Sequence, residues 1–124
     1  MSLGEYFENT KGTGVLATAD ENGNVDAAIY ARPHFQDEKT VAFIMNERLS
    51  YQNITSNPKA AYIFLEDSPG YNGKRLYLSK IAEETDKDKI DAVRRKTEKH
   101  HTMSLEEKHL VYFSVDRIRP LVGD

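Results

Sequence analysis

The chain has 124 residues, no cysteine, a formal net charge of -3 at pH 7 and an isoelectric point near 5.8. This length fits one domain with a single core, and the acidic balance gives no reason to expect nucleic acid as a partner. The absence of cysteine excludes disulfides, thiolate metal sites and a cysteine nucleophile. No apolar run approaches the roughly 18 residues that span a membrane, and the first residues lack the pattern of a signal peptide. We therefore expect a single domain over residues 1–124, located in the cytoplasm and without a membrane partner.

The first third of the chain predicts a short helix followed by three strands. Leu3, Tyr6 and Phe7 give Leu3–Asn9 an apolar stripe at helical spacing after Ser2. Residues 14–19 and 25–31 are apolar runs separated by the turn-forming sequence DENGN, so we expect them to pair as a hairpin. The polar residues 34–39 are predicted to be a loop, and residues 40–45 a third strand.

The remainder predicts a second helix, three more strands and weaker helical segments. Leu49–Ser56 has helical character, and residues 59–65 form a strand that is apolar on both faces, which indicates burial on both sides. Residues 67–73 are a loop, and residues 75–81 a half-exposed strand. A weak helical stripe ends at Arg95, and residues 104–107 carry a capping-box pattern. The last strand, 110–115, is again apolar on both faces, so we expect one face to cover the core and the other a second subunit.

The order of these elements indicates the fold class. Three strands in direct succession are too many for a doubly wound parallel sheet. Antiparallel pairing closed into a small barrel is the economical arrangement, because closure removes sheet edges. We therefore predict a mainly β (α+β) protein with six antiparallel strands and short flanking helices.

The turn after the third strand is the best candidate for binding an anion. A strand that leads into a turn and a helix start offers unpaired backbone N–H groups and the positive end of the helix dipole. Arg48 adds a fork of donors and Ser50 a hydroxyl, and Ser50 is also a possible N-cap. The alternative is an ordinary surface arginine beside a capping serine. We interpret the stretch 25–58 as part of a sheet that holds a flat, phosphorylated ligand.

Two side chains of the second strand are candidates for contact with a ring. Tyr30 and Arg32 are two residues apart and should share one face of the strand. Tyrosine can stack on a flavin, and arginine can stabilise the negative charge of a reduced one. The alternative is a half-buried aromatic beside a solvated arginine.

The four histidines do not predict a metal site. His100 and His101 are adjacent, and no carboxylate constellation or His-x-x-x-His spacing completes a ligand set. We expect surface histidines, with His34 kept as an exception because it follows the candidate ring-binding strand.

Three stretches of the sequence carry a family resemblance. "GVLATADENGNVDAAIYARP", "VAFIMNERLSYQNITSNPKAAYIFLE" and "GYNGKRLYL" resemble, in that order, the short members of the pyridoxamine 5′-phosphate oxidase-like family. The resemblance covers nearly the whole chain and is weakest over residues 83–108. It implies a split β-barrel that binds FMN as its cofactor and forms a homodimer, with two FMN sites made by both subunits.

The resemblance also implies positions for the cofactor. Its phosphate would lie against the turn and helix start formed by Asn46, Glu47, Arg48, Leu49, Ser50 and Asn53. The isoalloxazine ring would lie along Ala28, Ile29, Tyr30, Ala31, Arg32, Ile44 and Met45. The chain departs from the pyridoxamine phosphate oxidases in lacking tryptophan and in carrying Asp26 where they have a basic residue. Vitamin B6 oxidation is therefore not expected.

The expected function is that of an FMN-binding oxidoreductase. It would pass hydride or electrons between a nicotinamide-type donor and a small acceptor, and its catalytic side chains are not identified. One alternative is a non-catalytic flavin-binding electron carrier, store or sensor. Another is a split barrel that has lost flavin and binds haem or serves as a dimeric interaction module.

Overall fold

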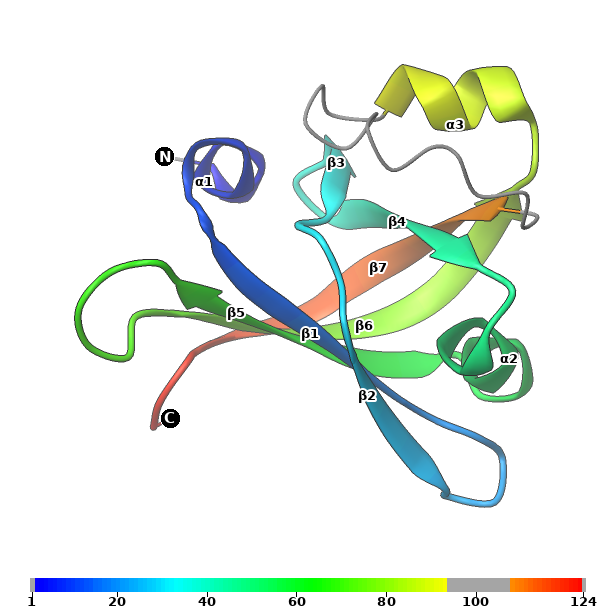
Figure 1. Cartoon of the computed structure of the whole chain (residues 1–124), viewed down its shortest axis with the longest axis horizontal. Coiled ribbons are helices and arrows are strands. Elements are labelled where there is room, and N and C mark those ends of the chain that lie inside the picture. The colour runs from blue at the N-terminus through cyan, green and yellow to red at the C-terminus, as the bar shows by residue number, and fades with distance from the viewer. Residues whose placement is uncertain (1, 94–107, 124) are drawn as a thin grey trace.

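The structure is a computed structural model that describes residues 2–93 and 108–123. These residues form one antiparallel sheet of seven strands in the order β2-β1-β5-β6-β7-β4-β3, flanked by three short helices (Figure 1). The strands are β1 (Gly12–Ala19), β2 (Val25–Ile29), β3 (His34–Asp37), β4 (Thr40–Asn46), β5 (Lys59–Glu66), β6 (Gly73–Glu84) and β7 (Lys108–Pro120). The helices are α1 (Leu3–Asn9), α2 (Leu49–Ser56) and α3 (Lys87–Val93).

The sheet curls into a barrel whose two edge strands are consecutive in the chain. β2 and β3 lie at opposite ends of the strand order, and residues 30–33 connect them across the gap (Figure 1). Alternation along each strand fills the interior. In β4, Val41, Phe43 and Met45 are buried in the main core, while Ala42 and Ile44 face the opposite side.

Each helix covers a different part of the barrel. Ser2 caps α1 through a capping box with Glu5, and the helix buries Phe7 in the main core. α2 follows β4 and buries Ile54 in the same core. α3 buries Ile90 against Ala42 and Leu110 on the outer face of β4 and β7. The three helices therefore cover apolar side chains that the curled sheet by itself leaves exposed.

Several elements confirm the sequence predictions and others correct them. The predicted bounds of α1 and α2 are confirmed, as is the antiparallel, mainly β class. The strand predicted over residues 25–31 ends at Ile29, and the loop predicted over 34–39 contains β3, which raises the strand number to seven. β3 is a short edge strand with an irregular register, so its alternation is too brief to recognise in the sequence. β7 continues to Pro120, beyond the predicted end at residue 115.

Two predicted burial patterns also differ from the structure. On the outer face of β7, where a second subunit was expected, α3 of the same chain covers Leu110. The outer face of β5 is not covered within one chain, since Ile63 is 41% exposed and Leu65 38% exposed. Ile29 of β2 and Val15 of β1 continue this row across the sheet to Ile63. A partly exposed apolar row therefore crosses β2, β1 and β5 among the described residues.

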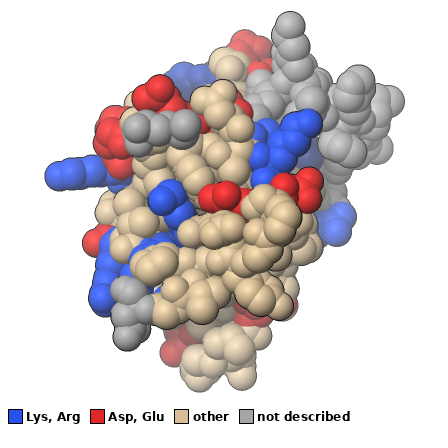
Figure 2. Space-filling model, turned by 90° about the vertical axis from the view of Figure 1, so that its left-hand side faces the viewer, with Lys and Arg blue, Asp and Glu red and all other residues tan. Residues whose placement is uncertain are grey.

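The surface of the described residues mixes both signs of charge. Figure 2 shows the side of the molecule on the left of Figure 1, where acidic and basic residues border an uncharged area. None of the three helices is long and apolar enough to cross a membrane. The predicted helical turn at 104–107, His100, His101 and the predicted helix end at Arg95 lie outside the described residues.

Candidate functional site

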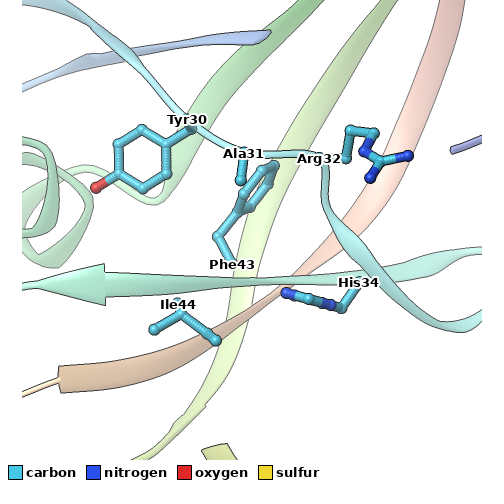
Figure 3. Close-up of a pocket in the computed structure, with 6 residues that line it drawn as sticks. All are labelled: Tyr30, Ala31, Arg32, His34, Phe43 and Ile44. Carbon is cyan, nitrogen blue, oxygen red and sulfur yellow. The ribbon is translucent and has the colours of Figure 1, made fainter. Parts of the chain in front are cut away.

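A small pocket lies where the β2–β3 connection passes over β4. Its volume is about 50 Å³, and it is lined by Tyr30, Ala31, Arg32, His34, Phe43 and Ile44 (Figure 3). Pockets that enclose a small organic molecule usually measure about 300–1,000 Å³. This pocket, as the described residues form it, is therefore too small to enclose a cofactor without further cover.

The backbone that forms one wall of this pocket is held from the inside of the barrel. The N–H of Tyr30 donates to the carbonyl of Gly14 at 3.0 Å. The fully buried Tyr62 donates its hydroxyl to the carbonyls of Tyr30 and Ala31, at 3.3 and 3.1 Å. A side chain at position 14 would collide with that hydroxyl, so glycine is required for this close approach. The connection between β2 and β3 is thus fixed in place although it belongs to no strand.

Tyr30 and Arg32 do not share a face, which corrects the prediction for these two residues. Because β2 ends at Ile29, strand alternation no longer applies to them. Tyr30 packs edge-on against Phe43 with ring centroids 5.9 Å apart, whereas the side chain of Arg32 points away from both rings (Figure 3). The guanidinium Nη1 instead donates to the carbonyls of Phe7, Glu8 and Thr10, at 2.8, 3.3 and 3.1 Å. Arg32 therefore caps the C-terminal end of α1.

We expect Arg32→Ala to lower the free energy of unfolding by about 1.5–3 kcal/mol, because it removes charged hydrogen bonds from carbonyls that α1 itself cannot satisfy. Urea unfolding followed by circular dichroism measures this effect. The Arg32→Lys variant is the matched control, since it keeps the charge without the fork of donors and should lose less stability. An Ala variant that is as stable as the wild type would contradict a capping role. Contact with the ligand would then again be the expected role of Arg32.

The predicted anion-binding turn lies at the end of β4 and the start of α2. Arg48 is the N-cap residue of α2, and no side-chain hydrogen bond caps this helix in the described part of the chain. Ser50 is inside the helix and buried, so the interpretation of Ser50 as the N-cap is wrong. Buried Asn53 donates to the hydroxyl of Thr18 at 3.1 Å, which ties α2 to β1. The first turn of α2 thus presents backbone N–H groups beside an exposed arginine.

Tyr30 links the pocket to this turn. Its ring lines the pocket, and its hydroxyl is hydrogen-bonded with Ser50. Burial raises the pKa of Tyr30, against the hydrogen bond from Ser50 and the charge of Arg48, which lower it. The hydroxyl of Ser50 also lies 3.5 Å from a carboxylate oxygen of Asp26. The electrostatics of the turn therefore combine the cation of Arg48, the carboxylates of Asp26 and Glu47, and two hydroxyl groups.

A second polar cluster holds the turn from the side of β7. His109 is only 5% exposed, and its Nε2 lies 2.8 Å from Glu47 Oε1, while its Nδ1 lies 2.9 Å from Glu83 Oε2. Tyr51 stacks on the imidazole with ring centroids 4.1 Å apart. The prediction of a surface histidine is therefore wrong for His109, whereas His34, kept as the exception, is buried and lines the pocket.

Comparisons with known proteins identify the fold. No family model matches the sequence, and no curated protein matches it significantly. An FMN-binding protein from Syntrophomonas wolfei subsp. wolfei matches with a TM-score of 0.76 at 16% identity, over 98% of this chain and 84% of that one. HupZ of Group A Streptococcus gives 0.71 at 21% identity, over 96% and 90%. A protein from Clostridium acetobutylicum related to general stress protein 26, of the pyridoxinephosphate oxidase family, gives 0.69 at 13%, over 94% and 83%.

These matches confirm the fold that the resemblance implied. The chain is a split barrel. Within the split barrel, the residues predicted to contact a ring divide into three groups. Tyr30, Ala31, Arg32 and Ile44 line the pocket. Met45 is fully buried in the core, and Ile29 is 71% exposed on the outer face of β2. Ala28 is partly buried on β2 and does not line the pocket.

Sequence reasoning missed three residues that the structure brings to the site. Phe43 lines the pocket. The alternation of β4 was the only sequence pattern that marked Phe43, and that pattern predicts a core residue. Tyr62 supports the pocket wall from β5, and His109 contacts the turn from β7. No local pattern marks the last two, because each acts on a segment that is distant in the sequence.

Proposed function

We propose that this split barrel binds FMN and serves as an oxidoreductase. It would pass hydride or electrons between a nicotinamide-type donor and a small acceptor. The observation that carries the proposal is the adjacency of an aromatic pocket and an anion-binding helix start, joined by the single residue Tyr30. A flavin mononucleotide has the matching parts, a flat ring system and a phosphate. The FMN-binding protein with the same fold supports the same ligand.

The residues present fit a phosphate at the turn. The first turn of α2 has N–H groups without a side-chain cap, and Arg48 adds a charged donor beside them. Tyr30 and Phe43, which pack edge-on, offer apolar surface for one side of a ring. The carboxylate of Asp26 opposes a phosphate electrostatically, so the net attraction would depend on Arg48 and the helix start.

We also propose that the working unit is a homodimer with a flavin site at each interface. The small pocket volume supports this, since the pocket that the described residues form cannot by itself enclose a ring system. The exposed apolar side chains of β2 and β5 support it as well, with Val25 82% exposed and Ile29 71% exposed. A second copy would bury this surface and complete the sites.

In this scheme FMN supplies the redox chemistry, and the chain's own residues bind and orient it. Arg48 and the amides of α2 would hold the phosphate, and Ser50 and Tyr30 would contribute hydroxyl groups nearby. Phe43 would exclude water from one face of the ring, and the fixed carbonyls of Tyr30 and Ala31 would keep that wall in place. No side chain is required as a general acid or base.

The first test is a visible absorption spectrum of the purified protein, followed by FMN titration with flavin fluorescence as the readout. We expect one FMN per chain. Turnover of a nicotinamide donor with an acceptor then separates an oxidoreductase from a non-catalytic flavin carrier. A protein that shows no flavin spectrum and ignores added FMN would overturn the proposal, and a Soret band would point to haem.

We expect Arg48→Ala to weaken FMN binding by about 1.5–3 kcal/mol, the usual contribution of a hydrogen bond to a charged group. The same titration measures this loss. Lys39→Ala is the matched control, because it removes one positive charge at the opposite end of β4 from the turn. If both variants bind FMN as tightly as the wild type, the phosphate does not lie at this turn.

A further inference from the structure

His109 makes contacts that require a particular protonation state. Its two ring nitrogens lie within 2.9 Å of carboxylate oxygens of Glu47 and Glu83. A neutral imidazole has one donor and one acceptor, while the cation has two donors. An ionised carboxylate only accepts hydrogen bonds. Both contacts can therefore be hydrogen bonds only when the ring is the cation, and loss of its proton directs a lone pair at one carboxylate.

The groups around Glu83 favour the charged form of its carboxylate. Lys80 Nζ lies 2.7 Å from Glu83 Oε1, and the hydroxyl of Tyr51 donates to Glu83 Oε2 at 2.8 Å. Burial raises the pKa of Glu83, but the hydrogen bonds from Lys80 and Tyr51 prevail and lower it overall. Lys80, Tyr51, Glu83, Glu47 and His109 therefore form one connected set of titratable groups among the described residues. The carboxylate of Glu83 is thus an acceptor at neutral pH.

The cluster is attached to the turn that we propose for phosphate binding. Glu47 directly precedes Arg48, the N-cap of α2, and Tyr51 lies in the first turn of that helix. The neighbouring Lys108 donates to the side-chain oxygen of Asn46 at 2.7 Å. The start of β7 therefore holds successive residues of the turn, through one contact from Lys108 and one from His109.

We propose that His109 is a proton-dependent positioning residue for the turn Asn46–Ser50. As the cation it holds Glu47, and with it the backbone of Arg48 and the start of α2, in the arrangement that presents donors to an anion. Loss of the proton weakens that hold. The consequence for ligand affinity rests on the proposed FMN function, whereas the movement of the turn does not. Histidine is the side chain that ordinarily changes charge near neutral pH, so the experiments below vary the pH.

The first experiment compares FMN affinity across pH 5.5–8.5, an interval set by histidine titration, in the wild type and in His109→Gln. The phosphate of FMN also titrates near pH 6 and affects both proteins equally, so the difference between the two curves isolates His109. We expect affinity relative to the variant to fall roughly five- to tenfold as the ring loses its proton, a typical size for coupling between sites. A constant ratio between the two proteins would overturn the proposal.

The second experiment needs no ligand. Nuclear magnetic resonance follows the His109 ring and the amides of residues 46–50 over the same pH range. We expect the amide signals to shift together with the ring signals in the wild type and to lose most of this response in Glu47→Gln. The Glu47 side chain is half exposed, so this substitution should leave the fold intact. Amides that ignore the ring would overturn the proposal even if FMN binds. Amides that follow the ring in a protein that does not bind FMN would support the positioning role and overturn only the proposed function.

Discussion

Gly14→Ala should lower the free energy of unfolding by about 3–5 kcal/mol. The added Cβ would lie 1.8 Å from the hydroxyl oxygen of Tyr62 and 2.7 Å from the carbonyl oxygen of Tyr30. Overpacking of a core costs about 1–3 kcal/mol. Moving either oxygen also disturbs the hydrogen bonds that fix the wall of the pocket, at roughly 1 kcal/mol each. Urea unfolding followed by circular dichroism gives the difference.

Gly4→Ala is the matched control for this substitution. Its added Cβ meets only Phe35, at 3.3 Å, and alanine is favoured over glycine in a helix by about 1 kcal/mol. We expect the two effects to nearly cancel, leaving stability within about 1 kcal/mol of the wild type. A Gly14→Ala protein that unfolds at the wild-type urea concentration would mean that residues 30 and 31 yield easily, and the site would then lack the rigid wall described above.

Phe7→Ala should cost about 3–5 kcal/mol, the range observed for removal of a buried aromatic side chain. Phe7 is fully buried, and its ring lies 5.0–6.2 Å from the rings of Tyr6, Phe35, Tyr62 and Phe64. It is also the contact that holds α1 to the barrel, and its carbonyl is one of those that Arg32 caps. Thermal and urea unfolding both measure the loss.

The exposed aromatic Tyr71, 79% accessible in the β5–β6 loop, offers the comparison for Phe7. Tyr71→Ala removes a ring of similar size from water and should change stability by less than about 0.5 kcal/mol. Equal effects of the two substitutions would show that the aromatic cluster under α1 contributes little. In that case the cap from Arg32 would be the main attachment of the helix.

Local patterns predicted the elements that carry a complete local signal. α1 has its apolar stripe and its capping box within eight residues, and α2 lies between a polar turn and Asn57. β6 shows the burial alternation that the sequence indicates for Leu76 and Leu78. β3 has no such signal, since a four-residue edge strand with an irregular register is too short for alternation to appear.

The residues of the candidate site also separate into those that a local sequence pattern marks and those that only distant contacts reveal. Arg48 and the start of α2 were found because a strand, a turn and a helix follow one another in the chain. The role of Arg32 was predicted incorrectly, because its partners are carbonyls of α1 more than twenty residues earlier. His109 was missed for the same reason, since Glu47 is 62 residues away and Glu83 is 26 away.

The sequence by itself determined the mainly antiparallel architecture, the helix start that can face an anion and the absence of thiol chemistry. These properties depend on short-range periodicity, turn residues and composition, which neighbouring residues express without reference to the rest of the chain. Only the tertiary structure decided that residues 30–33 bridge the two sheet edges, that Arg32 serves α1 and that His109 holds the turn. Those roles depend on distances between segments far apart in sequence, which exist only after the seven strands have paired in their order.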